Sequence, residues 1–198
     1  MITANSDELR LTILAVAEEF FRSYGYNKTT MVDIAQQCGC SAANLYRYFP
    51  SKQDIAEAVS IRCMNDRVSF LREAIRHSNS SAEQRLRDYV THNLQYTQEV
   101  CATSPKIIEL IGYMLEQRPN LVHVKIRAQC SLLAEIIAYG NETGEFSVDN
   151  VIETAQTVYV ALTAFDVPIF QSLYSEQEFE LMANNVVDLL LRGLTRHD

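Results

Sequence analysis

The sequence predicts an all-α protein of about nine helices. Nearly half of its 198 residues are hydrophobic, enough for a packed core, and only six glycines and four prolines interrupt the chain. Apolar residues recur at three- and four-residue spacing, and no segment alternates Val, Ile and Thr as a half-buried strand would. A chain of this length accommodates one large helical unit or two small domains that share an interface.

The first expected helix covers about residues 6–24. Ser6 is a candidate N-cap, and Gly25 is a candidate stop because glycine adopts a positive φ at little cost. Its apolar residues recur at helical spacing: Leu9, Ile13, Leu14, Ala17, Phe20 and Phe21. This stripe is expected to pack on the elements that follow.

Two short helices joined by a tight corner are expected within residues 30–49. Thr30 is placed to cap the first, and Asp33 completes the spacing of a capping box. Gly39 suits the corner because it tolerates a positive φ, and Ser41 is placed to cap the second helix. The spacing of the two caps and the glycine therefore predicts a helix, a turn and a helix.

The second of these helices has one apolar and one polar side. Leu45 and Phe49 are four residues apart and form a buried stripe. A small residue at position 35, glycine at 39 and an apolar residue at 45 match a helix-turn-helix, whose second helix lies in the DNA major groove. The residues left on or near the outward side are Ala42, Asn44, Tyr46, Arg47 and Tyr48.

This stretch resembles the tetracycline-repressor (TetR) family of bacterial transcription regulators. The family pattern T-x-x-x-I-A-x-x-x-G-x-S-x-x-x-L-Y-x-Y-F-x-x-K is matched by Thr30, Ile34, Ala35, Gly39, Ser41, Leu45, Tyr46, Tyr48, Phe49 and Lys52. The similarity covers about the first quarter of the chain. It implies a helix-turn-helix DNA-binding domain at residues 1–51 and a helical effector-binding and dimerisation domain at residues 52–198, with 52–77 as a connecting helix.

The expected DNA contacts divide into base readers and phosphate contacts. Arg47 can bind guanine, Asn44 can bind adenine, and Ala42 is placed to touch a thymine methyl group. The resemblance implies phosphate contacts from Thr30, Tyr46, Tyr48 and Lys52, and Lys28 and Ser41 complete the expected set. The alternative for the tyrosines is core packing with a solvated hydroxyl, and for Lys52 it is a solvated helix start.

The rest of the chain predicts further helices. The connecting helix should bury Ile55, Val59, Cys63, Phe70 and Leu71. After a polar break at 77–81, helices are expected at about 82–102, 105–117 with Pro105 in the first position, 121–139, 150–165 and 175–196. Residues 146–149 read as a short loop.

The net charge of −8 is unevenly distributed. Residues 1–76 hold nine basic and nine acidic groups, so the whole excess of acid lies in residues 77–198. A neutral DNA-binding segment implies weak non-specific attraction to phosphate, and we expect specific binding by a dimer. An architectural, sequence-independent DNA binder should instead be basic in this segment.

The second domain has an apolar interior that contains several hydroxyls and an imidazole. Composition alone favours a plain core here, but the family resemblance implies a pocket for a small hydrophobic ligand, lined by Tyr89, His92, Tyr96, Ile107, Ile111, Tyr113, Met114, Ile126, Cys130, Tyr159 and Phe165. The alternative is a plain bundle core in which buried tyrosines reach backbone carbonyls.

The last two long helices have broad apolar stripes. A four-helix contact with a second copy of the chain is expected to use Val151, Ala155, Val158, Leu162, Phe179, Met182, Val186, Val187 and Leu190. Two-fold symmetry would place two recognition helices about 34–36 Å apart, facing a palindromic DNA operator. In the alternative, these helices cap only their own domain.

Other functions have weaker support. Cys38 and Cys40 are too close for a C-x-x-C site, no cofactor is expected, and metal binding and thiol sensing remain minor alternatives. Catalytic motifs such as G-x-G-x-x-G, G-x-S-x-G and H-E-x-x-H are missing from the sequence, which argues against an enzyme. With no apolar run of about 18 residues and no signal-peptide character, we expect a cytoplasmic protein without membrane contact.

The sequence therefore predicts a dimeric DNA-binding transcription regulator. In the expected mechanism, a small hydrophobic effector enters the second domain, repositions the helix at 52–77 and releases a repressor from its operator. The alternative is the same fold acting as an activator or as a protein-responsive regulator.

Overall fold

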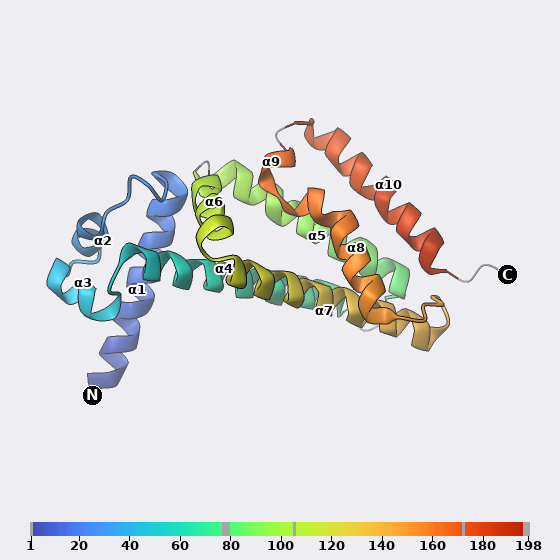
Figure 1. Ribbon diagram of the computed structural model, residues 1–198, viewed down its shortest axis with the longest axis horizontal. Helices are drawn as coiled ribbons and strands as arrows, with labels where there is room; N and C mark the ends of the chain where they lie inside the picture. The colour runs from blue at the N-terminus through green and yellow to red at the C-terminus, as the bar shows by residue number, and fades with distance from the viewer. Residues whose placement is uncertain (1, 77–79, 105, 172, 196–198) are drawn as a thin grey trace. The chain divides into compact units, whose positions relative to one another are not determined.

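The computed structural model describes residues 2–76, 80–104, 106–171 and 173–195, and these contain ten helices and no strand (Figure 1). The nine longer helices are α1 Ile2–Ser23, α2 Met31–Gln37, α3 Ala42–Tyr48, α4 Lys52–Ile75, α5 Ala82–Thr103, α6 Ile107–Gln117, α7 Pro119–Thr143, α8 Val151–Asp166 and α10 Glu176–Leu194. A single turn, α9 (Pro168–Gln171), lies between the last two. The all-α class is confirmed.

Local capping determines where several helices begin. The Thr30 hydroxyl accepts from the Asp33 N–H, and the Thr30 N–H donates to the Asp33 carboxylate, so the predicted capping box is present. Ser41 caps α3 by accepting from the Asn44 N–H, also as predicted. Because each cap satisfies a backbone N–H within three residues, the short α2 and α3 have defined starts.

Some predicted boundaries differ from the structure. α1 begins at Ile2, so Ser6 lies inside the helix and is not its N-cap; neither glycine nor proline in residues 2–5 opposes the extra turn. The predicted role of Pro105 falls outside the described residues, and so do residues 77–79 of the predicted break at 77–81. α7 continues through Gly140 and ends just before Gly144, which has a φ of +78°.

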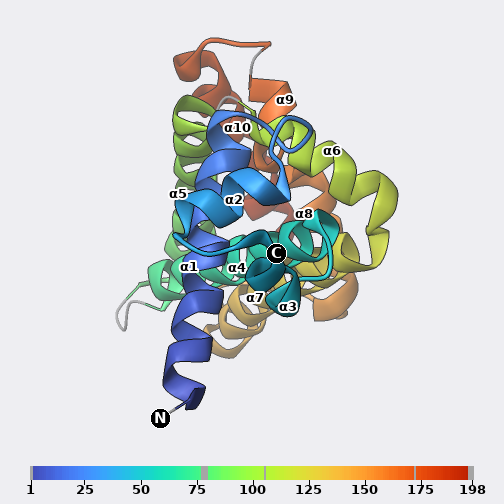
Figure 2. The ribbon, with the colours of Figure 1, turned by 90° about the vertical axis from the view of Figure 1, so that its left-hand side faces the viewer.

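The chain forms two compact units, and the first is built around the helix-turn-helix. It consists of residues 1–65 and 101–122. In it, α2 packs against both α1 and α3 (Figure 2), and α6 packs against α1. The core side chains of this unit include Ile13, Ala17, Phe21, Ile34, Leu45, Ile55, Val59, Leu110 and Met114.

This division differs from the expected boundary after residue 51. About the first four turns of α4, residues 52–65, belong to the first unit, where Ile55, Ala56 and Val59 are buried in its core. α6 also belongs there, since Leu110 and Met114 are buried in the same core. The predicted second domain therefore contributes two segments to the DNA-binding unit.

The second unit consists of residues 66–100 and 123–198. Its core combines α5, α7, α8, α10 and the last turns of α4, and α8 and α10 pack side by side (Figure 1). Leu71 is buried there as predicted, but the prediction for Phe70 is wrong, since its side chain is 43% exposed. The inward positions on this part of α4 are Val68, Leu71 and Ile75, which leaves residue 70 on the outside.

Candidate nucleic-acid interface

The first unit holds α3 by its apolar side. Leu45 is fully buried and Phe49 nearly so, and the small side chain of Ala35 is buried in the same core. Gly39 forms the corner with a φ of +66°, a conformation that costs other residues about 1 kcal/mol or more. The opposite side of α3 is therefore presented to solvent in a fixed orientation.

The exposed side of α3 is rich in hydrogen-bond donors. Tyr46 is half exposed and Arg47 is exposed, while Asn44, Tyr48 and Ala42 are partly buried. α3 contains no acidic residue, and within the described residues Arg47 forms no ion pair. A guanidinium and an amide that are not neutralised by neighbours suit the acceptor edges of guanine and adenine.

The two capping hydroxyls differ in what they can offer a phosphate. Thr30 donates its hydroxyl proton to the Asp33 carboxylate at 2.6 Å, so a phosphate would have to displace that bond. Ser41 only accepts, from the Asn44 N–H at 3.2 Å, and its hydroxyl proton is available. Lys28 is exposed on the loop before α2. Ser41 and Lys28 are thus better placed than Thr30.

Lys52 has a structural role that the sequence did not indicate. Its ammonium donates to the carbonyls of Tyr26 at 2.7 Å and Thr29 at 2.9 Å, and it lies 4.4 Å from the centre of the Tyr26 ring. Burial lowers the pKa of the ammonium, and Glu109 partly offsets that. These contacts occupy the donors of the Lys52 ammonium. In this structure Lys52 therefore holds the loop before α2 in place, and the ammonium is not free for the predicted phosphate contact.

α6 is attached to the same loop. The Asn27 N–H donates to Glu109 at 3.2 Å, and the ring centres of Tyr26 and Tyr113 are 4.5 Å apart. Gly25 has a φ of +92°, and a Cβ there would come within 2.6 Å of the Glu109 carboxylate. The loop therefore fits closely against α6.

These contacts correct part of the predicted effector pocket. Ile107, Ile111, Tyr113 and Met114 belong to the first unit, where Met114 is buried in the core and the Tyr113 ring packs against Tyr26 of the loop. The other members lie in the second unit: Tyr89, His92, Tyr96, Ile126, Cys130, Tyr159 and Phe165. The eleven residues therefore do not form one cluster in a single unit, because α6 packs against α1.

Three of these second-unit members, Tyr89, Tyr96 and Tyr159, lie beside a buried polar cluster that the sequence prediction did not include. It joins α4, α5, α7 and α8 and consists of Arg67, Asn93, Thr97, Lys125, Gln129 and Asp166, named here the polar core. The Tyr159 hydroxyl donates to Asp166 at 3.4 Å, and Arg67 lies 4.7 Å from the centre of the Tyr96 ring. A usable signal was present, since Lys125 and Gln129 continue the helical spacing of buried Leu132 and Ile136.

His92 and Phe165 take other positions. The His92 Nδ1 lies 2.7 Å from the Asp88 carbonyl of its own helix, and its ring packs edge-on against Phe70. Phe165 is buried with its ring centre 5.1 Å from that of Phe179, in the hydrophobic core of the second unit. Both side chains make packing contacts within the second unit.

Most of the predicted dimer residues are also in the wrong place for that role. Five are buried in the core of their own unit: Ala155, Val158, Leu162, Phe179 and Val187. Val151, Met182, Val186 and Leu190 are partly buried against it. The large apolar side chains that α8 and α10 do expose are Ile152, Val160, Leu181 and Leu189. α8 and α10 each have a buried apolar stripe and an exposed one, and the prediction named mainly residues of the buried stripe.

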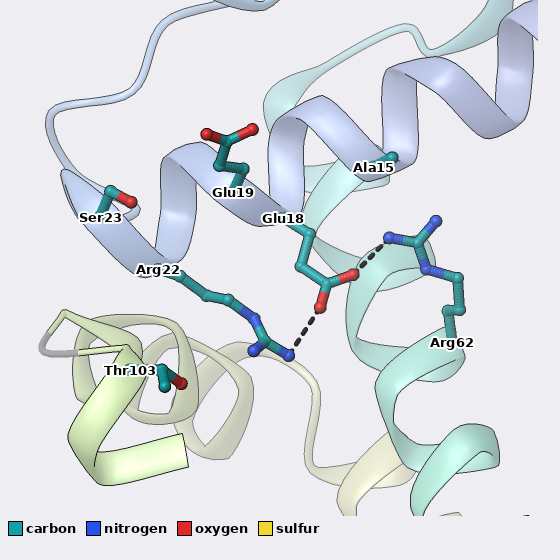
Figure 3. A pocket seen from close by; sticks show the side chains of 7 residues that line it. All are labelled: Ala15, Glu18, Glu19, Arg22, Ser23, Arg62 and Thr103. Atoms are coloured by element: carbon teal, nitrogen blue, oxygen red, sulfur yellow. Dashed lines mark hydrogen bonds and ion pairs between the residues drawn. The ribbon is translucent and has the colours of Figure 1, made fainter. Parts of the chain in front are cut away.

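A polar cavity of about 320 Å³ lies in the first unit (Figure 3). Its lining residues are Ala15, Glu18, Glu19, Arg22, Ser23, Arg62 and Thr103. Glu18 pairs with Arg22 at 2.6 Å and also with Arg62, so its carboxylate is held between two guanidinium groups (Figure 3). The cavity shares no residue with the predicted effector pocket.

Burial raises the pKa of the neighbouring Cys63 thiol to about 11, so the reactive thiolate is scarce near neutral pH. Within the described residues, no group of three or more His, Cys, Asp or Glu side chains is placed to hold a metal ion. No described helix is long and apolar enough to cross a membrane.

Two family models match the chain. The model for bacterial regulatory proteins of the tetR family matches residues 13–59, and the tetracyclin repressor-like C-terminal domain matches residues 82–187, more than half of the chain. The chain belongs to the TetR family. Members of this family are DNA-binding regulators of transcription and not enzymes, which agrees with the geometry of α2 and α3.

Individual proteins resemble this TetR-family chain to different extents. The HTH-type transcriptional activator FasR of Mycolicibacterium smegmatis is 35% identical over 96 residues, a match that covers 45% of this chain and 43% of that protein. A transcriptional regulator of Cytophaga hutchinsonii superposes with a TM-score of 0.72 at 24% identity, over 93% of this chain and 97% of that one. The fatty acid degradation regulator FadR of Bacillus halodurans gives 0.69 at 20% identity, over 96% and 97%. These solved structures share the fold.

Proposed function

We propose that the chain is a sequence-specific repressor that binds a palindromic operator as a homodimer and leaves it when a small hydrophobic effector binds. The observation that supports this most directly is the exposed, acid-free side of α3, held by buried Leu45 and Phe49. A neutral first segment favours specific contacts over general attraction to phosphate. Residues 1–51 supply the DNA contacts, and residues 52–198 supply the effector and dimer contacts.

The DNA contacts are assigned from donor availability. Arg47 and Asn44 read base edges, and Ala42 contacts a base at the N-terminal end of the helix. Ser41, Tyr46, Tyr48 and Lys28 donate to phosphates. Thr30 and Lys52 do not contact DNA directly. Thr30 caps the start of α2, and Lys52 holds the loop before α2.

The dimer forms through the outer stripe of α8 and α10. Ile152, Val160, Leu181 and Leu189 are each more than 60% exposed, and a stripe of large apolar side chains on two adjacent helices favours burial against its own copy. Two-fold pairing then places the two α3 helices for two half-sites, one helical turn of DNA or a multiple apart.

Effector binding is coupled to DNA binding through elements of the first unit. α4 runs from that unit into the second, and α6 contacts the loop before α2 through Glu109 and Tyr113. A shift of α6 or α4 would therefore disturb the base of α2. The effector can change operator affinity only by its differential affinity for the two arrangements, and a factor of 100 requires about 2.7 kcal/mol.

The test begins with selection of DNA fragments by the full chain, followed by anisotropy titration of the selected site. Arg47→Ala should weaken binding by about 10- to 100-fold, the range of one bidentate base contact. Gln53→Ala, an exposed change at the start of α4, is the matched control and should leave affinity unchanged. Equal affinity of the Arg47→Ala variant and the parent would contradict the proposal.

A second candidate is activation of transcription. The matched region of the FasR relative, which is named an activator, supports it. In-vitro transcription from a promoter that carries the selected site distinguishes repression from activation. A repressor lowers transcript yield when the chain is added, and an activator raises it.

A further inference from the structure

The polar core of the second unit has an unequal number of positive and negative groups. Asp166 pairs with Arg67 at 2.5 Å and with Lys125 at 2.5 Å. Across the described residues, neither cation pairs with any other carboxylate. Two cations thus share one anion, which leaves an excess of one positive charge.

This excess lies in a buried environment. The side chains of Asp166, Arg67 and Lys125 are 4%, 10% and 20% exposed. Burying a charge without a full counter-charge costs several kcal/mol, so proteins usually pair such groups or use them to bind a ligand. Burial lowers the pKa of the Lys125 ammonium, Asp166 opposes that, and Arg67 lowers it further.

The hydrogen bonds of the polar core are also incomplete. Gln129 is fully buried, and its Nε2 donates to Asn93 at 3.4 Å, but its Oε1 has no partner. An unpaired buried acceptor is unfavourable because it has lost its hydrogen bonds to water. Turning the amide over would place Oε1 against the Asn93 oxygen, which already accepts from Arg67, so a flip does not solve the problem.

We propose that the polar core binds the anionic head group of an amphipathic effector. The head group pairs with Arg67 and Lys125 beside Asp166, which brings the cluster to two cations and two anions. An O–H or N–H next to the head group donates to Gln129 Oε1. This inference rests on the proposed effector response and specifies the chemistry of the ligand, which is an acid with an apolar body.

The surroundings suit the apolar body. Tyr96 stacks on Arg67, and Ile126 and Cys130 are partly buried against the core on the same helix as Lys125 and Gln129. Tyr96 thus supplies aromatic surface against a cationic group, and Ile126 and Cys130 supply apolar surface on α7, a combination that suits an amphipathic molecule.

The test measures ligand binding to the full chain without DNA, by calorimetry. The probes are decanoate, decanol and decyl phosphate, which share one apolar body and differ in the head group. Decanoate or decyl phosphate should bind at least about 10-fold more tightly than decanol, because a charged hydrogen bond contributes more than a neutral one. The preferred anion identifies the head group as carboxylate or phosphate.

Lys125→Met is the informative variant. It leaves the Arg67–Asp166 pair in place and removes the excess charge, so the chain should unfold at the same temperature as the parent or higher. Its affinity for the anionic probe should fall about 10- to 100-fold, with decanol affinity unchanged. Arg127→Met removes a positive charge from the same helix at an exposed position and should change neither affinity.

Several results would overturn the inference. They are failure of every anionic probe to bind, equal binding of decanoate and decanol, or undiminished anion binding by Lys125→Met. Release of DNA is scored in a separate titration. A chain that binds the anionic probes as described but keeps its operator retains the inference and refutes effector release. If only neutral ligands release the chain from its operator, effector release is supported and the inference of an anionic head group is refuted.

Discussion

Replacing Lys52 with methionine tests whether this side chain braces the loop before α2 or contacts DNA. The ammonium makes two short hydrogen bonds to carbonyls, at 2.7 and 2.9 Å, and lies over the Tyr26 ring. A charged hydrogen bond contributes about 1.5–3 kcal/mol when buried. Lys52 is only partly buried and water can replace part of each bond, so we take about 1 kcal/mol for each.

The expected loss is therefore about 2 kcal/mol in the free energy of unfolding, which lowers the Tm of a chain of this size by about 4–8 °C. Thermal unfolding at one fixed protein concentration measures it, since a dimer's Tm depends on concentration. Lys28→Met is the matched control, because Lys28 is exposed and makes no hydrogen bond or ion pair within the described residues. Its Tm should equal that of the parent.

The salt dependence of DNA binding distinguishes the two roles. Each lost phosphate contact lowers the slope of log affinity against log salt by about 0.9 per chain. Lys28→Met should show that decrease, and Lys52→Met should not. If Lys52→Met unfolds at the parent's temperature and shows the reduced slope, the bracing role assigned to Lys52 is refuted.

Three further predictions concern other parts of the chain. Gly25→Ala should destabilise the protein by about 1–3 kcal/mol in urea unfolding, because its φ of +92° and its contact with Glu109 both disfavour a side chain; an unchanged midpoint would refute this. Alkylation of Cys63 should be slow at pH 8 and rise towards pH 11, since burial raises the pKa of its thiol; rapid labelling at pH 8 would restore the thiol-sensor alternative. Leu189→Asp, at a 67% exposed position, should give a folded monomer by light scattering, and a persistent dimer would exclude this face.

The burial of the Cys63 thiol determines the sign of its contribution to the pH dependence of stability. A thiol whose pKa is higher in the folded chain than in the unfolded chain favours the folded state fully at low pH. As the pH rises from about 9 to about 11, the unfolded chain loses that proton first, so the contribution of Cys63 to stability falls.

Features decided within a few residues could be predicted from the sequence. Thr30 and Asp33 form the expected capping box, Gly39 adopts the expected positive φ, and Ser41 caps α3. Each depends on a hydrogen bond or a torsion angle that is local to the chain. The four-residue spacing of Leu45 and Phe49 predicted that both are buried on one side of α3. The residues on the opposite side were therefore predicted to be exposed.

Features that depend on distant parts of the chain could not be predicted in the same way. The contact between Asn27 and Glu109 joins residues 82 apart, and no local pattern assigns α6 to the first unit. On α8, Val158 is buried and Val160 is exposed, although both are valines in a broadly apolar helix. Periodicity identifies two stripes there, and only packing decides which of them is the core.

The central claim is that two copies of α3 bind one palindromic operator through Arg47 and its neighbours. The most direct measurement is a stoichiometric anisotropy titration of the selected operator and of a single half-site, with the parent chain and Arg47→Ala. The account predicts two chains per operator, much weaker binding to the half-site, and a loss of about 10- to 100-fold for the variant. One chain per operator, or equal affinity of parent and variant, would contradict it.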